Sequence, residues 1–104
     1  MSMLSITFHC TKDNLEEWEN YMNETLVLMA ENLMDVNRYI LSEVHSDYID
    51  EGKNYNLLLL FENNDLREDF VESELQNISE RIETKFGQEV MIFNTLLNTK
   101  TSRM

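Results

Sequence analysis

The chain has 104 residues, of which 8 are basic and 20 acidic, so its formal net charge is −12. This length predicts one domain over residues 1–99, followed by a frayed C-terminal tail at residues 100–104. The acidic balance argues against nucleic-acid partners and anionic membranes, because both are bound by positively charged surfaces.

The cysteine content and the N-terminus favour a cytoplasmic protein. Cys10 is the single cysteine and cannot form an internal disulfide, and no basic residue precedes Lys12 as a secretory signal would require. The longest apolar runs, residues 26–30 and 57–61, are far shorter than the ~20 residues of a membrane-spanning helix. We therefore expect no membrane segment.

The first third of the chain predicts a strand and then a helix. Residues 4–10 alternate between apolar and polar side chains, which is typical of a half-buried strand. Over residues 15–33, apolar side chains recur at steps of three and four, which predicts an amphipathic helix with its acidic residues mostly on the solvated face. Trp18 lies on the apolar stripe of this helix and is expected in the core.

The rest of the chain predicts two strands, a second helix and a last strand. Strands are expected at residues 39–46 and 55–62, joined by a turn at residues 47–54. Five successive apolar residues, 57–61, indicate that both faces of the third strand are covered. Residues 63–65 supply caps for a second helix, whose apolar stripe runs from residue 66 to residue 86 with one spacing of five, and Gly87 ends it. A final strand is expected at residues 90–97.

The order β-α-β-β-α-β predicts an α+β, ferredoxin-like fold. It comprises a four-stranded antiparallel sheet in the order 4-1-3-2, with both helices on one face. We call the other side the open face. The alternation of the first strand leaves Ser5, Thr7 and His9 on the open face. The third strand must also direct one of its two sets there, and we assign Tyr55, Leu57, Leu59 and Phe61 to the helices and Asn56, Leu58 and Leu60 to the open face.

An apolar open face predicts a homodimer. Leu58 and Leu60 of the third strand are expected on that face. The last strand is expected to add some of its residues Val90, Ile92 and Leu96. Each fully exposed Leu or Ile forfeits ~1.5–3 kcal/mol of burial, and a second copy related by a two-fold axis would recover it. The alternative is that the neighbouring polar residues keep this face adequately hydrated.

Several segments carry a resemblance to a known family. They are Glu16-Glu17-Trp18, Tyr21-Met22, Tyr55, and the block of residues 81–87 running into residues 93–97. With these segments the chain resembles, over nearly its whole length, a small bacterial family of unknown function. The resemblance implies a ferredoxin-like fold similar to the dimeric α+β barrels, and it implies no particular activity. Relatives often have a His-Ile-Pro step where this chain has Leu26-Val27-Leu28, so any role of that histidine would be lost here.

Candidate chemical groups are few. Cys10 and His9 are neighbours on a strand and point to opposite faces, so they cannot form a thiol–imidazole pair. His9 and His45 are expected two strand spacings apart, ~10 Å, which is too far to share one zinc ion. The carboxylates Asp47, Asp50 and Glu51 lack the spacing of a calcium loop. We therefore predict no catalytic residue, no metal site and no cofactor.

Two functions remain open. The first is a non-enzymatic, homodimeric module that binds a small ligand or a protein partner. The alternative is a small enzyme of the dimeric α+β-barrel type, resembling monooxygenases or isomerases, with a pocket at the sheet face. In either case the candidate site residues are those of the open face: Ser5, Thr7, His9, Asn56, Leu58 and Leu60.

Overall fold

The structure is a computed structural model and describes residues 1–45 and 52–103. Its helices and strands are, in chain order, β1 (Ser2–Thr11), α1 (Leu15–Tyr21), α2 (Val27–Glu31), β2 (Arg38–Glu43), β3 (Gly52–Phe61), α3 (Asn64–Glu72), α4 (Glu74–Phe86) and β4 (Val90–Asn98). Three short turns adjoin the helices: η1 (Lys12–Asn14), the π-helical turn η2 (Met22–Leu26) and η3 (Gly87–Glu89).

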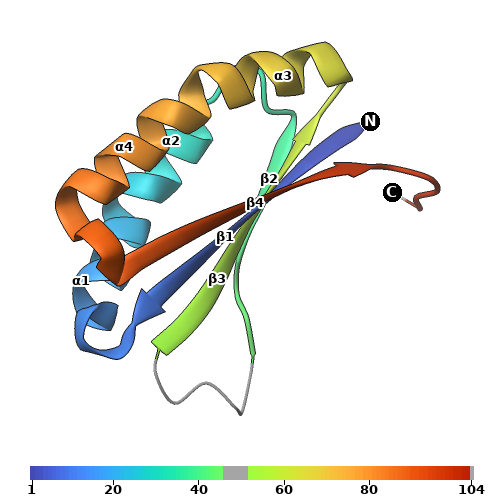
Figure 1. Cartoon of the computed structure of the whole chain (residues 1–104). Helices are drawn as coiled ribbons and strands as arrows, with labels where there is room; N and C mark the ends of the chain where they lie inside the picture. Colours follow the sequence, from blue (N-terminus) through green and yellow to red (C-terminus); the bar gives the residue numbers. More distant parts are fainter. Residues whose placement is uncertain (46–51, 104) are drawn as a thin grey trace.

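The four strands form one antiparallel sheet in the order β2-β3-β1-β4. This is the predicted order 4-1-3-2 counted from the other edge of the sheet. The helices lie together on one side of the sheet (Figure 1). The predicted ferredoxin-like fold is therefore confirmed, with β1 and β3 at the centre and β2 and β4 at the edges.

The element boundaries differ from prediction at several places. β2 ends at Glu43 rather than at residue 46, and β3 begins at Gly52, inside the segment predicted as a turn. The predicted turn residues 47–51, with Asp47, Asp50 and Glu51, lie outside the described residues. The first predicted helix contains the π-helical turn η2 between α1 and α2.

The second predicted helix is divided at Ser73. The Ser73 hydroxyl donates to the Asp69 carbonyl oxygen at 2.6 Å, a local bond that competes with the regular helical ladder. α4 then begins at Glu74. The division explains the one spacing of five residues in the apolar stripe, because both Phe70 and Leu75 are buried despite that spacing.

The core lies between the sheet and the helices. Four side chains of β1 are fully buried there: Leu4, Ile6, Phe8 and Cys10. Four side chains of β3 are at most 3% exposed: Tyr55, Leu57, Leu59 and Phe61. Both sets confirm the predicted helix-facing sides of these strands. Trp18 is also fully buried, with its ring centre 5.1 Å from that of Phe8 and 5.5 Å from that of Phe86.

The last strand contributes different residues to the open face from those predicted. Val90 and Ile92 pair with Cys10 and Phe8, and Leu96 pairs with Leu4, so all three belong to the helix-facing side. The prediction that they lie on the open face was wrong, because it took the β4 alternation in the wrong phase. The open-face apolar residues of β4 are instead Met91, Phe93 and Leu97, which oppose the open-face residues His9, Thr7 and Met3.

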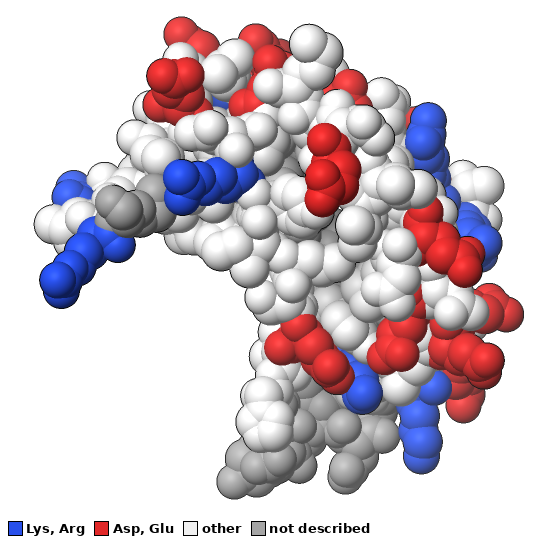
Figure 2. Space-filling view, turned by 180° about the vertical axis from the view of Figure 1, so that it is seen from behind, with Lys and Arg blue, Asp and Glu red and all other residues white. Residues whose placement is uncertain are grey.

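The open face remains partly apolar and uncovered in the single chain. Ile40, Met91 and Phe93 are 55%, 47% and 54% exposed, whereas Leu58 is half-buried and Leu60 only 5% exposed. Figure 2 shows a hollow on the side of the molecule away from the helices, where few atoms belong to charged residues. The acidic residues gather mainly over the convex side (Figure 2).

Candidate functional site

A cluster of polar side chains occupies the centre of the open face. We call it the open-face polar cluster; it comprises Ser5, Thr7 and His9 from β1 with Asn54 and Asn56 from β3. The Asn56 side-chain amide donates to Ser5 Oγ at 2.8 Å and to Thr7 Oγ1 at 3.3 Å. These bonds use both hydrogens of the amide and join the two central strands.

His9 is oriented by Asn54 in the same cluster. Its Nδ1 lies 2.6 Å from the side-chain oxygen of Asn54, directly opposite on β3. Since an amide oxygen only accepts hydrogen bonds, Nδ1 carries the hydrogen, and in the neutral ring Nε2 is then an acceptor. The Asn54 contact therefore fixes both the orientation of the ring and its tautomer.

The strand register brings the predicted site residues to one face. Ser5 opposes Leu58 and Thr7 opposes Asn56 across β1 and β3, while Leu60 opposes Met3 towards one end of these strands. All six predicted residues therefore share the open face, although Leu60 is almost covered. The candidate site is a polar centre flanked by the apolar side chains of β2, β3 and β4.

Sequence reasoning missed several residues of this face, among them Asn54, Met91 and Phe93. Asn54 was assigned to a turn, so its contact with His9 was not foreseen. Met91 and Phe93 were missed because β4 was read in the wrong phase. Because β4 has apolar residues in both phases, only its register with β1 assigns Met91 and Phe93 to the open face.

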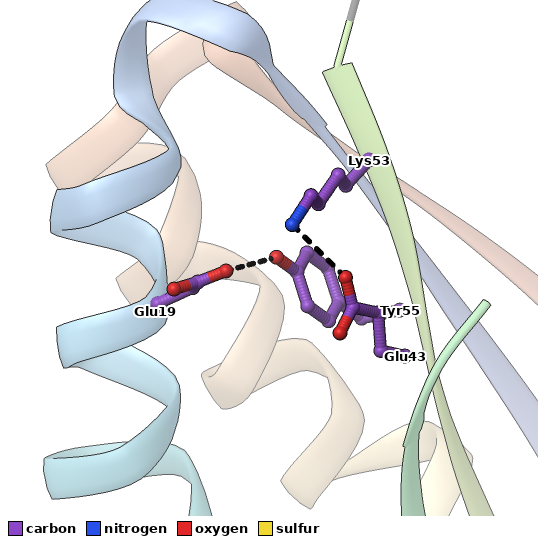
Figure 3. A network of polar contacts seen from close by, with 4 residues as sticks. All are labelled: Glu19, Glu43, Lys53 and Tyr55. Carbon is purple, nitrogen blue, oxygen red and sulfur yellow. Dashed lines mark hydrogen bonds and ion pairs between the residues drawn. The ribbon is translucent and has the colours of Figure 1, made fainter. Parts of the chain in front are cut away.

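A second polar network lies on the helix-facing side, where Tyr55 and Lys53 of β3 meet Glu19 of α1 and Glu43 of β2 (Figure 3). The Tyr55 hydroxyl donates to Glu19 Oε1 at 2.7 Å, and Lys53 Nζ lies 3.0 Å from Glu43 Oε1. Burial, followed by the hydrogen bond to Glu19, raises the pKa of Tyr55. Glu19 is half-buried and anchors α1 to the sheet.

Two titratable groups on the helix-facing side, Cys10 and Tyr55, have raised pKa values. Burial, with smaller contributions from Glu89 and Glu19, raises the pKa of the Cys10 thiol to about 11. A thiol with that pKa stays protonated near neutral pH and is a poor nucleophile. The raised pKa of Tyr55 likewise keeps its phenol protonated, so we place the candidate site on the open face instead.

Among residues 1–45 and 52–103, no three or more His, Cys, Asp or Glu side chains are grouped so as to hold a metal ion. Within those residues, no helix combines the length and the apolar character needed to cross a membrane.

Solved structures share the fold of this chain at low sequence identity. HapK from Hahella chejuensis superposes with a TM-score of 0.70 at 7% identity, over 100% of this chain and 97% of that chain. A putative antibiotic biosynthesis monooxygenase from Deinococcus radiodurans gives 0.69 at 8% identity, over 100% and 97%. A dimeric ferredoxin-like protein from an uncultured marine organism gives 0.69 at 11% identity, over 100% and 99%. These likenesses establish a fold shared with dimeric ferredoxin-like and monooxygenase-like proteins.

The sequence itself places the chain in a family. Residues 1–100 match a family described as a domain of unknown function, DUF4286, and the chain belongs to that family. No curated protein matches the chain. The family resemblance expected from the sequence is thereby confirmed.

Proposed function

We propose that the chain is a non-enzymatic homodimeric module of the cytoplasm, with the open face as its dimer interface and the open-face polar cluster as its ligand-contacting part. The proposal rests on the observation that apolar side chains of this face are only partly buried in the single chain. Ile40, Met91 and Phe93 are each about half exposed there, while the helices cover the opposite face of the sheet.

A second copy of the chain is the partner that best fits the open face. Two chains that each carry −12 repel each other wherever their acidic surfaces meet. The open-face residues of β1, β3 and β4 are all uncharged, and Arg38 of β2 adds one positive charge, so contact there brings few charges and no carboxylates of these strands together. The fold shared with a dimeric ferredoxin-like protein also supports this partner.

The unused hydrogen-bonding positions of the cluster support a ligand role. Asn56 Oδ1 and His9 Nε2 remain available as acceptors, and the Ser5 and Thr7 hydroxyls, having each accepted a bond from Asn56, can still donate. Polar groups at the centre of an apolar interface are costly to bury unless water or a ligand satisfies them. A small polar molecule held between the two sheets would satisfy these positions.

Native mass spectrometry with a charge-insertion variant tests the dimer. We expect the unmodified protein at twice the chain mass, and Leu58→Glu at the mass of one chain, because the new carboxylate would be buried without a partner. Phe93→Glu should act in the same way from β4. A small ligand would appear as additional mass on the dimer, which Asn56→Ala would no longer carry.

The matched control is Leu28→Glu, which makes the same change at a 59% exposed leucine on α2. It should leave the dimer intact, because α2 belongs to the helix layer. If both open-face variants kept twice the chain mass while folded, as checked by circular dichroism, the proposed interface would be wrong.

The enzyme alternative is supported by the oriented His9 and by the fold shared with a putative monooxygenase. It uses the same cluster, with His9 Nε2 as a proton acceptor. An enzyme would convert the molecule it binds, so incubation with the ligand found by mass spectrometry separates the two functions. An unchanged ligand mass favours the binding module.

A further inference from the structure

A groove separate from the open face runs along the helix layer. It has a volume of about 680 Å³ and lies between α2, with the segment that follows it, and the pair α3 and α4. Its apolar lining includes Met29, Leu33 and the core side chains Phe70 and Ile78. Leu28 and Met34, which also line it, are 59% and 98% exposed. A volume of this size with an apolar lining suits a small organic ligand.

The groove has one cationic end, formed by Arg81. One guanidinium nitrogen, Nη1, lies 3.6 Å from Met29 Sδ, and within residues 1–45 and 52–103 no carboxylate lies within ion-pair distance of it. An adjoining hollow of about 470 Å³ shares Asn77 and Arg81 with the groove and adds Lys85 and Glu80. Two cations and one carboxylate thus surround this end, in a chain that is strongly acidic overall.

The other end of the same groove wall is acidic. Glu74 lies seven residues before Arg81 on α4, so the two side chains share one face of the helix about 10 Å apart. Asp35, beyond the end of α2, also lines the groove. The groove therefore offers a positive charge at Arg81, an apolar middle, and negative charge from Glu74 and Asp35.

We propose that this groove binds a medium-chain monocarboxylate, with its carboxylate at Arg81 and its hydrocarbon chain along Met29, Leu33 and Ile78. An extended chain advances ~1.2 Å per bond, so about eight carbons span the distance from Arg81 towards Glu74. The proposal does not depend on the dimer, because the groove lies on the helix layer and not on the open face.

Calorimetric titration of the full-length protein with three eight-carbon probes tests the head-group preference. Octanoate should bind about tenfold more tightly than 1-octanol, because only the carboxylate forms a charge-assisted bond with Arg81. Octanedioate should bind about tenfold more weakly than octanoate, because its second carboxylate would face Glu74 and Asp35.

Two variants with one matched control test the assigned residues. Arg81→Gln should weaken octanoate binding about tenfold and leave 1-octanol binding unchanged. Arg103→Gln removes the same charge from the C-terminal tail and should leave both affinities unchanged. Glu74→Gln should raise the affinity for octanedioate towards that for octanoate.

Any of three results would overturn the proposal. The first is equal affinity for octanoate and 1-octanol, and the second is no measurable binding of octanoate at millimolar concentration. The third is an equal loss of octanoate affinity in Arg81→Gln and Arg103→Gln. An octanedioate affinity that Glu74→Gln leaves unchanged would also overturn it. Arg81 and Glu74 are exposed side chains. Both variants should therefore fold, and circular dichroism is the check.

Discussion

Gly52 of β3 lies so close to the backbone of β1 that a larger residue would clash with it. A Cβ atom added there would lie 2.0 Å from the carbonyl oxygen of Cys10 on the neighbouring strand. That oxygen belongs to the backbone of the central strand β1, so it cannot move without disturbing the pairing of Cys10 with β3 and β4. A glycine here lets β3 begin at full register with β1.

Gly52→Ala should therefore lower the free energy of unfolding by about 1–3 kcal/mol, the typical cost of a forced backbone shift. Urea titration followed by the fluorescence of the buried Trp18 measures it. The neighbouring Lys53→Ala is the control: it removes one exposed ion pair with Glu43 and should change stability far less, because solvent screens exposed ion pairs. Equal losses in the two variants would contradict the steric explanation.

At the scale of elements, the phase of β1 was predictable from the sequence and the phase of β4 was not. β1 alternates strictly, and Ile6 and Thr7 fall on the faces assigned to them. β4 has apolar residues in both phases, so Ile92 and Phe93 were equally plausible on the open face. Only the register with β1 decides between them, and register is a property of the folded sheet.

The attachment of α3 to the sheet was not predictable for a similar reason. Arg67 is buried beneath the ends of β1 and β4, where its Nη1 donates to the carbonyl oxygens of Met3 at 3.1 Å and Leu97 at 2.8 Å. Its Nη2 donates to Asn98 Oδ1 at 3.1 Å. In the sequence Arg67 is one charged residue in a polar stretch, and nothing nearby in the chain identifies its distant partners.

Arg67→Met should lower the free energy of unfolding by about 2–4 kcal/mol, because it keeps much of the side-chain volume while leaving buried carbonyl groups without donors. Denaturant unfolding at one fixed protein concentration measures the loss. Arg103→Met, in the exposed tail, should change stability by less than about 0.5 kcal/mol. A loss in Arg67→Met no larger than that of the tail variant would show that α3 does not depend on this anchor.

At the scale of the whole molecule, charge and apolar surface are separated. The acidic residues gather mainly over the convex side, and the hollow away from the helices carries few charged atoms (Figure 2). A homodimer built on the open face would therefore join two bodies of charge −12 through a nearly neutral interface. Long-range repulsion opposes its assembly, while burial of apolar side chains favours it.

This separation predicts that salt strengthens the dimer. Raising the ionic strength from about 0.01 M to about 0.1 M shortens the screening length from about 30 Å to about 10 Å, so repulsion between the two acidic bodies falls. The dissociation constant measured by analytical ultracentrifugation at neutral pH should decrease about tenfold or more over this range. Near pH 4.3, where the net charge is close to zero, the same change in salt should have little effect on the folded protein. A dimer that weakens as salt is added at neutral pH would instead be held by ion pairs, which the uncharged open-face residues of β1, β3 and β4 do not supply.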